Sequence, residues 1–313
     1  MSKLIDGSES SLRAFLENLP GVDKVGAESR AAMLGTRSIK TKSKARAIDL
    51  AISMVDLTTL EGADTPGKVK SLCAKALRPD PTDPTVPHVG AICVYNDMVK
   101  IARDYLDSIG GQSIPVAAVS TAFPSGRASM DVKLRDTKDA IEAGAAEIDM
   151  VIDRGAFLSG KFGLVFDEIE SIKKLCGDKA HLKVILETGE LATYDNVRKA
   201  SYLAMLAGAD FIKTSTGKVT PAATPPVVLV MLEAVRDFYA MTGKRIGVKP
   251  AGGIRTTKDA IKQLVLVNET AGPEWLSPDL FRIGASALLN DLLLQRMKLR
   301  NGRYSSANYV TVD

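Results

Sequence analysis

Short apolar runs alternate with longer amphipathic stretches along most of the chain. Each run is followed by a stretch with apolar residues at positions i, i+3 and i+4, a pattern that predicts an amphipathic helix. Strands that alternate with helices favour βαβ units and a parallel sheet. The predicted strands are residues 52–57, 89–95, 115–120, 146–152, 182–187, 210–215, 245–250 and 280–285.

The number of predicted strands distinguishes between two parallel α/β architectures. Eight strand–helix units over about 260 residues fit a (β/α)8 TIM barrel, whereas a doubly wound sheet needs only about five or six strands. The proline-rich segment 78–88 predicts a connector without helix. We therefore expect an α/β fold with a TIM barrel at residues 46–298. An N-terminal helical extension at 1–45 and a C-terminal tail at 299–313 flank it.

Composition and charge narrow the class of protein only mildly. The chain has 313 residues, of which 45% are hydrophobic, and a net charge of +4, which gives no argument for a nucleic-acid or membrane partner. Cys73, Cys93 and Cys176 are isolated in sequence, which suits a reducing compartment better than a disulfide scaffold. The chain has no apolar stretch long enough to span a bilayer and no apolar signal core. We expect a cytoplasmic protein.

Two lysines and an aspartate fall at or near the C-terminal ends of predicted strands. Lys213 and Lys249 lie near the ends of neighbouring strands, and Asp149 lies in the strand at 146–152. Catalytic groups of TIM barrels come from these ends, and neighbouring strands are about 4.8 Å apart. Two ammonium groups this close cannot both stay protonated, and a neutral lysine condenses with a carbonyl to a Schiff base. Asp149 is the candidate proton carrier for that reaction.

Two alternatives compete with Schiff-base chemistry: the lysines could be ordinary surface residues, or the reaction could depend on a metal ion. A single lysine at a strand end is more often a surface residue whose alkyl chain covers apolar neighbours. A metal-dependent reaction would need ligands such as imidazole at the C-terminal ends of the strands. His88 and His181 both precede predicted strands, so they belong to the opposite end of the barrel. We therefore expect no metal site.

Glycine-rich loops follow the last three predicted strands. Glycines allow the backbone to approach an anion closely, and late loops of TIM barrels commonly hold phosphate. A lone Gly-Gly pair is usually only a turn, but three such loops beside the lysine pair favour a phosphate site. The candidates are Gly217 and Lys218 after the sixth strand, Gly252 and Gly253 after the seventh, and Gly284, Ala285 and Ser286 after the eighth.

The motifs that carry these residues resemble the deoxyribose-phosphate aldolases, which are Schiff-base-forming (class I) aldolases. The resemblance runs from about residue 50 to 295 through DLTTL, AICVY, EIDMVI, KVILETGEL, ADFIKTSTGK, GVKPAGGIR and FRIGAS. It implies reversible cleavage of 2-deoxy-D-ribose 5-phosphate to D-glyceraldehyde 3-phosphate and acetaldehyde, without metal or organic cofactor. It also implies that Lys213 forms the Schiff base, that Lys249 lowers the pKa of Lys213, and that Asp149 relays protons.

The resemblance extends to the surroundings of these three residues. It implies a phosphate pocket made by Gly217, Lys218, Gly252, Gly253 and Ser286. The supporting positions that it implies are Asp56, Thr58, Cys93, Lys183 and, in the tail, Tyr309, which matches a proton-transfer tyrosine better than Tyr304 does.

Two alternative functions and one unknown stay open from the sequence. One alternative is another Schiff-base TIM-barrel aldolase that acts on a larger sugar phosphate. The other is a barrel that binds sugar phosphates without catalysis. The expected partners are small sugar phosphates and aldehydes, and the oligomeric state is undetermined, a homo-oligomer included.

Overall fold

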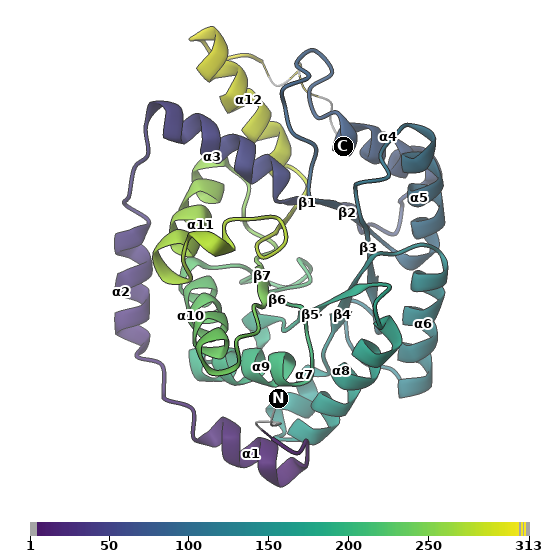
Figure 1. Ribbon diagram of the computed structural model, residues 1–313, viewed down its shortest axis with the longest axis vertical. Coiled ribbons are helices and arrows are strands. Elements are labelled where there is room, and N and C mark those ends of the chain that lie inside the picture. The colour runs from purple at the N-terminus through teal and green to yellow at the C-terminus, as the bar shows by residue number, and fades with distance from the viewer. Residues whose placement is uncertain (1–4, 307, 309, 311–313) are drawn as a thin grey trace.

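The computed structural model describes residues 5–306, 308 and 310 of the chain, and it contains one parallel sheet of eight strands. Hydrogen-bonded neighbours follow the order β7-β6-β5-β4-β3-β2-β1-β8, and isolated parallel bridges at Val248–Phe281 and Ala251–Gly284 join the two ends (Figure 1). The prediction of a (β/α)8 barrel is confirmed. The strands are β1 (Val55–Thr58), β2 (Ala91–Val94), β3 (Val116–Ser120), β4 (Glu147–Val151), β5 (His181–Ile185), β6 (Phe211–Lys213), β7 (Gly247–Lys249) and β8 (Ile283–Ala285).

Helices cover the outside of the barrel (Figure 1). Thr256 caps α11 in a reciprocal capping box with Asp259, and Pro225 occupies the first turn of α10. The helices after β1 are α4 (Pro66–Leu77), α5 (Val99–Ser108), α6 (Met130–Glu142), α7 (Arg154–Leu158), α8 (Phe162–Cys176), α9 (Tyr194–Leu206), α10 (Pro225–Thr242), α11 (Thr257–Thr270) and α12 (Leu288–Asn301). Short 3₁₀ turns are η1 (Asn96–Met98), η2 (Thr188–Glu190) and η3 (Pro273–Trp275).

The first predicted strand, residues 52–57, was wrong at its start. Ile52 and Ser53 are the last residues of a helix, α3 (Thr41–Ser53), and β1 begins only at Val55. Ile52 is fully buried in this helix, and a short buried apolar run has the same pattern in a helix as in a strand. The other seven predicted strands overlap observed ones within a few residues.

The N-terminal extension lies along the outer helices of the barrel (Figure 1). Its first helix, α1 (Glu9–Glu17), packs against α8 and α9, and its second, α2 (Lys24–Leu34), packs against α10 and α11. The expected division into 1–45, 46–298 and 299–313 stays a prediction; α3 runs across its first boundary and α12 across its second.

The buried face of α1 leads to a stability prediction. Leu16 is fully buried against the barrel helices, so a Leu16→Ala variant should lose about 2–5 kcal/mol of unfolding free energy. Urea denaturation measures the loss, and kcat should not change because Leu16 is remote from the strand ends. Leu164→Ala, at a side chain that is 47% exposed, is the matched control and should unfold close to the parent midpoint. Equal midpoints for both variants would contradict the packing role of α1.

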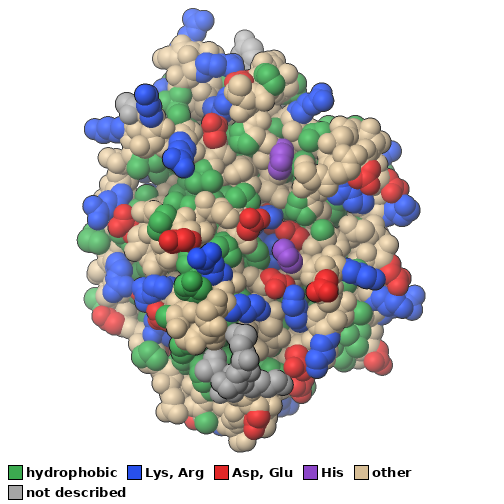
Figure 2. All heavy atoms as spheres, in the orientation of Figure 1, with side chains coloured by type: hydrophobic (Ala, Val, Ile, Leu, Met, Phe, Trp, Pro, Cys, Tyr) green, Lys and Arg blue, Asp and Glu red, His purple; other side chains and the backbone are tan. Residues whose placement is uncertain are grey.

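The helices and the surface charge bear on the kind of partner that the protein can have. In the part of the chain that the structure describes, no helix is long and apolar enough to cross a bilayer. Figure 2 shows acidic and basic side chains interspersed over one face of the molecule, together with histidines. His181 opens β5 and His88 precedes β2, so the prediction that they lie at the N-terminal ends of strands is confirmed.

Candidate active site

Lys213, Lys249 and Asp149 meet inside the barrel. The strand register pairs Lys213 with Lys249, the last residues of β6 and β7. Nζ of Lys213 donates to Oδ2 of Asp149 at 2.7 Å, and Nζ of Lys249 donates to the same oxygen at 2.6 Å. The three side chains are at most 3% exposed. The structure thus brings together the three residues that the sequence predicts, with the carboxylate of Asp149 as a common acceptor for the nitrogens of both lysines.

Lys249 and Asp149 belong to a closed ring of ion pairs inside the barrel. From Lys249 the ring continues to Asp56, whose Oδ2 is 2.6 Å from Nζ of Lys249. Arg282, just before β8, contacts Oδ1 of Asp56 at 2.7 Å through Nη1 and Oε1 of Glu147 at 3.1 Å through Nη2.

Lys183 closes the ring on its other side. Its Nζ donates to Oε2 of Glu147 and lies 3.5 Å from Oδ1 of Asp149. Three carboxylates and three cations therefore alternate around a ring that is almost entirely buried. We call these residues the ion-pair ring: Asp149, Lys249, Asp56, Arg282, Glu147 and Lys183.

The ring fixes the charges of its own members next to Lys213. Burial alone would raise the pKa of Asp149, but Lys213, Lys249 and Lys183 hold that pKa well below its usual range. Burial would lower the pKa of Lys249, but Asp149 and Asp56 raise it well above its usual range. Asp149 is therefore an anion and Lys249 a cation at neutral pH.

Cys93 lies beside Asp149 as a neutral thiol. Its Sγ is 3.9 Å from Oδ2 of Asp149, and burial raises the pKa of the thiol to about 11. The side chain belongs to a small apolar cluster with Leu60, Ala117 and Val119 at the same end of the barrel. Cys93 therefore contributes apolar surface beside Asp149.

A cavity of about 390 Å³ opens above Lys213, bounded by the loops after β1, β6, β7 and β8. The structure places all five predicted phosphate-pocket residues on its wall, together with Thr58, whose hydroxyl donates to the backbone oxygen of Asp56 at 2.8 Å. The predicted pocket residues on the wall are Gly217, Lys218, Gly252, Gly253 and Ser286.

Free backbone donors lie at the wall of this cavity. Among the described residues, the N–H groups of Gly217, Gly252, Gly253 and Ser286 find no protein acceptor. That of Lys218 donates to Oγ1 of Thr216 at 3.1 Å. The three glycines have φ between 81° and 84°, a region that side chains other than glycine seldom adopt. Unpaired N–H groups in such loops form concave anion sites.

Glu187 holds the loop after β6 in place. It is a fully buried, non-glycine residue with φ of 52°, and it accepts a hydrogen bond of 2.5 Å from the hydroxyl of Thr216. The same hydroxyl accepts from the backbone of Lys218, so Glu187 orients the loop between Lys213 and Lys218. Burial raises the pKa of Glu187 against the opposing effect of the Thr216 hydrogen bonds.

Sequence reasoning missed several charged groups of the site, and two of them had a readable signal. Glu147 lies two residues before Asp149, so both side chains project from the same face of β4. Arg282 interrupts an apolar run, and a buried arginine requires an anionic partner. Lys68 and Arg255, which line the cavity, carried no such signal.

Of the two tail tyrosines, Tyr304 lies within the described residues. Tyr309 lies outside the described residues. Tyr304 is 72% exposed and its ring lies 3.7 Å from Nζ of Lys298 on α12, and it is not on the wall of the cavity. The described part of the chain also contains no group of three or more His, Cys, Asp or Glu side chains arranged to hold a metal ion.

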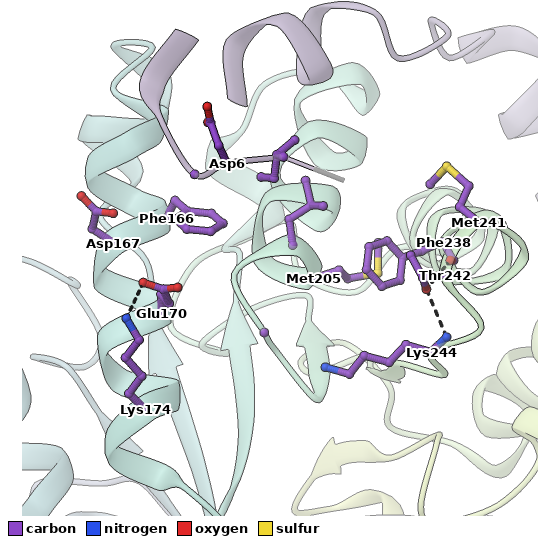
Figure 3. Close-up of a pocket in the computed structure, with 14 residues that line it drawn as sticks. Asp6, Phe166, Asp167, Glu170, Lys174, Met205, Phe238, Met241, Thr242 and Lys244 are labelled. Carbon is purple, nitrogen blue, oxygen red and sulfur yellow. Dashed lines mark hydrogen bonds and ion pairs between the residues drawn. The ribbon is translucent and has the colours of Figure 1, made fainter. Parts of the chain in front are cut away.

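A larger cavity lies elsewhere in the molecule. It measures about 630 Å³ and is bounded by residues 5–7, α8, the end of α9 and the C-terminal end of α10. Figure 3 shows Phe166 and Phe238 on its wall and the ion pair of Glu170 with Lys174 at its edge. Lys213, Lys249 and Asp149 do not line this cavity, whereas Lys213 lines the smaller one, which is therefore the candidate active site.

The fold and this site define a class of protein, a TIM barrel with buried lysines and a shared carboxylate near the C-terminal ends of its strands, where TIM-barrel enzymes carry their catalytic groups. Comparison with known proteins agrees: residues 50–293 match the DeoC/LacD family of aldolases. The chain belongs to that family. It is 48% identical to deoxyribose-phosphate aldolase of Mus musculus over 86% of this chain and 87% of that protein.

Further similarities cover the same part of the chain. Deoxyribose-phosphate aldolase of Homo sapiens is 47% identical over 86% of this chain and 87% of its own length. The crystal structure of a putative deoxyribose-phosphate aldolase from Coccidioides immitis is 28% identical, with a TM-score of 0.69 over 92% of this chain and 98% of that one.

Proposed function

We propose that this protein cleaves 2-deoxy-D-ribose 5-phosphate reversibly to D-glyceraldehyde 3-phosphate and acetaldehyde through a Schiff base on Lys213. The single observation that carries the proposal is the contact of Lys213 with the ion-pair ring. The ring balances its own charges, three carboxylates against three cations, and Lys213 is a fourth cation that shares Asp149 with Lys249. A buried charge without its own counterion is costly, which favours Lys213 over Lys249 as the nucleophile.

The neutral amine of Lys213 attacks C1 of the open-chain sugar phosphate, and loss of water gives a protonated imine. This cation accepts the electron pair of the C2–C3 bond when that bond breaks. Asp149, with Lys249 beside it, takes the proton of the C3 hydroxyl through water, and D-glyceraldehyde 3-phosphate leaves. The enamine that remains is protonated at carbon, and hydrolysis releases acetaldehyde and the free lysine.

The cavity wall supports a phosphorylated substrate. The free N–H groups at Gly217, Gly252, Gly253 and Ser286 would bind the phosphate oxygens, and Lys218 would supply a positive charge. Ala287 follows Ser286 and offers only its backbone there. The phosphate is bound at one end of the substrate, and its binding energy orients C1, at the other end, toward Lys213.

The expected setting of the reaction follows from charge and cysteine content. The small net charge of +4 supports small sugar phosphates and aldehydes as partners, without nucleic acid. The three cysteines are free and buried, which supports the cytoplasm as the compartment.

Borohydride trapping tests the reaction class and the nucleophile together. The protein is incubated with acetaldehyde and sodium borohydride, digested, and mapped by mass spectrometry. We expect a reduced two-carbon adduct on Lys213. An adduct confined to other lysines would refute the proposal. A larger ketose phosphate that is trapped and cleaved in preference to deoxyribose 5-phosphate would favour a different aldolase of the same class.

Lys218 provides a separate prediction for the phosphate pocket. Its ammonium group pairs only with the exposed carboxylate of Glu61 in the described structure, so Lys218→Ala should not disturb the fold. We expect KM for deoxyribose 5-phosphate to rise about 10-fold or more, the effect of losing one charge-assisted hydrogen bond. The kcat/KM for unphosphorylated 2-deoxyribose should stay constant, as should both values in the control Lys100→Ala on α5. Equal losses with both sugars would contradict a phosphate role.

A further inference from the structure

Two of the six residues of the ion-pair ring, Arg282 and Glu147, make no contact with Lys213. Arg282 and Glu147 are joined at 3.1 Å, they are 6% and 3% exposed, and neither lines the cavity above Lys213. Within the ring, Arg282 is joined to Lys249 through Asp56, and Glu147 is joined to Asp149 through Lys183. No step of the proposed reaction uses them.

We infer that Arg282 and Glu147 are positioning residues that keep Lys213 unprotonated by balancing the charge of the ion-pair ring. The inference rests on the proposed Schiff-base role of Lys213 and adds a cause for its neutral state. Asp149 would hold the proton of Lys213 strongly if its negative charge were not already matched by Lys249 and Lys183. Arg282 keeps those two lysines available, because it shares the charge of Asp56 and of Glu147 that they would otherwise have to balance alone.

The direction of the effect follows from counting charges. Without Arg282, three carboxylates face two ring cations, and the ring carries one net negative charge. Lys213 is the lysine that contacts the ring from outside it, through Asp149, so its protonated form is stabilised and a higher pH is needed to free the amine. Without Glu147, the ring carries one net positive charge, which favours the free amine at lower pH. Interactions between buried charges are weakly screened, so they extend across the ring.

The other charged and titratable groups around Lys213 are the same in every variant of the test. These groups lie on the elements around Lys213, in the ion-pair ring and on the cavity wall. These groups are Asp56 on β1, Glu61 and Lys68 after β1, Cys93 on β2, Asp149 on β4, Lys183 on β5, Glu187 after β5, Lys218 after β6, Lys249 on β7 and Arg255 after β7. A difference between variants therefore reports the substituted charge.

Three variants test the inference: Arg282→Met, Glu147→Gln, and the double variant. The readouts are the pH at which kcat/KM reaches half of its maximum and the pH dependence of borohydride trapping on Lys213. We expect Arg282→Met to move both midpoints to alkaline pH by about one unit or more. Glu147→Gln should move them to acid pH, and the double variant, with two carboxylates and two cations left in the ring, should return close to the parent.

The controls separate charge balance from a structural role. Arg282→Lys keeps the cation and should keep the parent midpoint even if stability falls. Lys133→Met removes a cation from another buried ion pair, formed with Glu168 at 2.7 Å between α6 and α8, and should lower stability without moving the midpoint. Thermal unfolding of each variant shows that the measured protein is folded.

Each outcome supports or overturns the inference. An unchanged midpoint in folded Arg282→Met, or a double variant that stays shifted, would overturn it. If Arg282→Met does not fold, an acid shift in Glu147→Gln that the double variant reverses supports the inference. An unchanged midpoint in Glu147→Gln overturns it. Parent protein that traps acetaldehyde on Lys213 while these shifts are absent refutes the charge-balance role alone. Parent protein without an adduct on Lys213 refutes the proposed function itself.

Discussion

A Lys213→Leu variant is expected to lose about 10⁴- to 10⁶-fold in kcat, because it removes the amine that forms the covalent intermediate. The fold should survive the substitution. The ion-pair ring keeps three carboxylates and three cations without Lys213, so no buried charge is left unpaired. Leucine also supplies an aliphatic side chain at a position that is only 3% exposed.

The measurement combines turnover with binding. Coupled detection of D-glyceraldehyde 3-phosphate gives kcat, and isothermal titration with glyceraldehyde 3-phosphate gives the affinity of the phosphate pocket. We expect the affinity to fall less than about 10-fold, because the phosphate donors remain in place. A variant with substantial kcat, or one that still forms a borohydride adduct at parental yield, would exclude Lys213 as the nucleophile.

Much of this site could be predicted because chemistry and strand position coincide in the sequence. Lys213 and Lys249 end short apolar runs, and in a parallel barrel such ends meet at one face. Asp149 was readable for the same reason. The (β/α)8 fold followed from the regular alternation of strand and helix, which depends on periodicity and little on exact boundaries.

Three parts of the structure could not be predicted. The first is the contact between Glu147 and Arg282, which are 135 residues apart and which only barrel closure brings together. The start of β1 was misplaced because Ile52 is equally buried at the end of α3. Which backbone N–H groups of the glycine loops are free could not be predicted either, because Thr216 takes that of Lys218 through a side-chain contact.

Lys249→Leu is the second substitution with a large expected effect, and it differs from Lys213→Leu in its cause. It removes a cation from the ion-pair ring, so three carboxylates face two cations. Oδ2 of Asp149 then has Lys213 as its remaining ammonium donor. Lys213 should form a full ion pair with Asp149 and stay protonated at neutral pH. We expect kcat to fall about 10²- to 10⁴-fold, the range for loss of proton-transfer function.

The pH dependence distinguishes this cause from simple loss of structure. Because the amine of Lys213 is still present, raising the pH should restore part of the activity of Lys249→Leu, whereas Lys213→Leu should gain nothing. Binding of glyceraldehyde 3-phosphate should persist in both variants, and Lys133→Leu is the control for removal of a buried lysine elsewhere. Activity of Lys249→Leu equal to that of the parent at neutral pH would show that Lys213 loses its proton without help from Lys249. The charge balance of the ring would then not be the source of its reactivity.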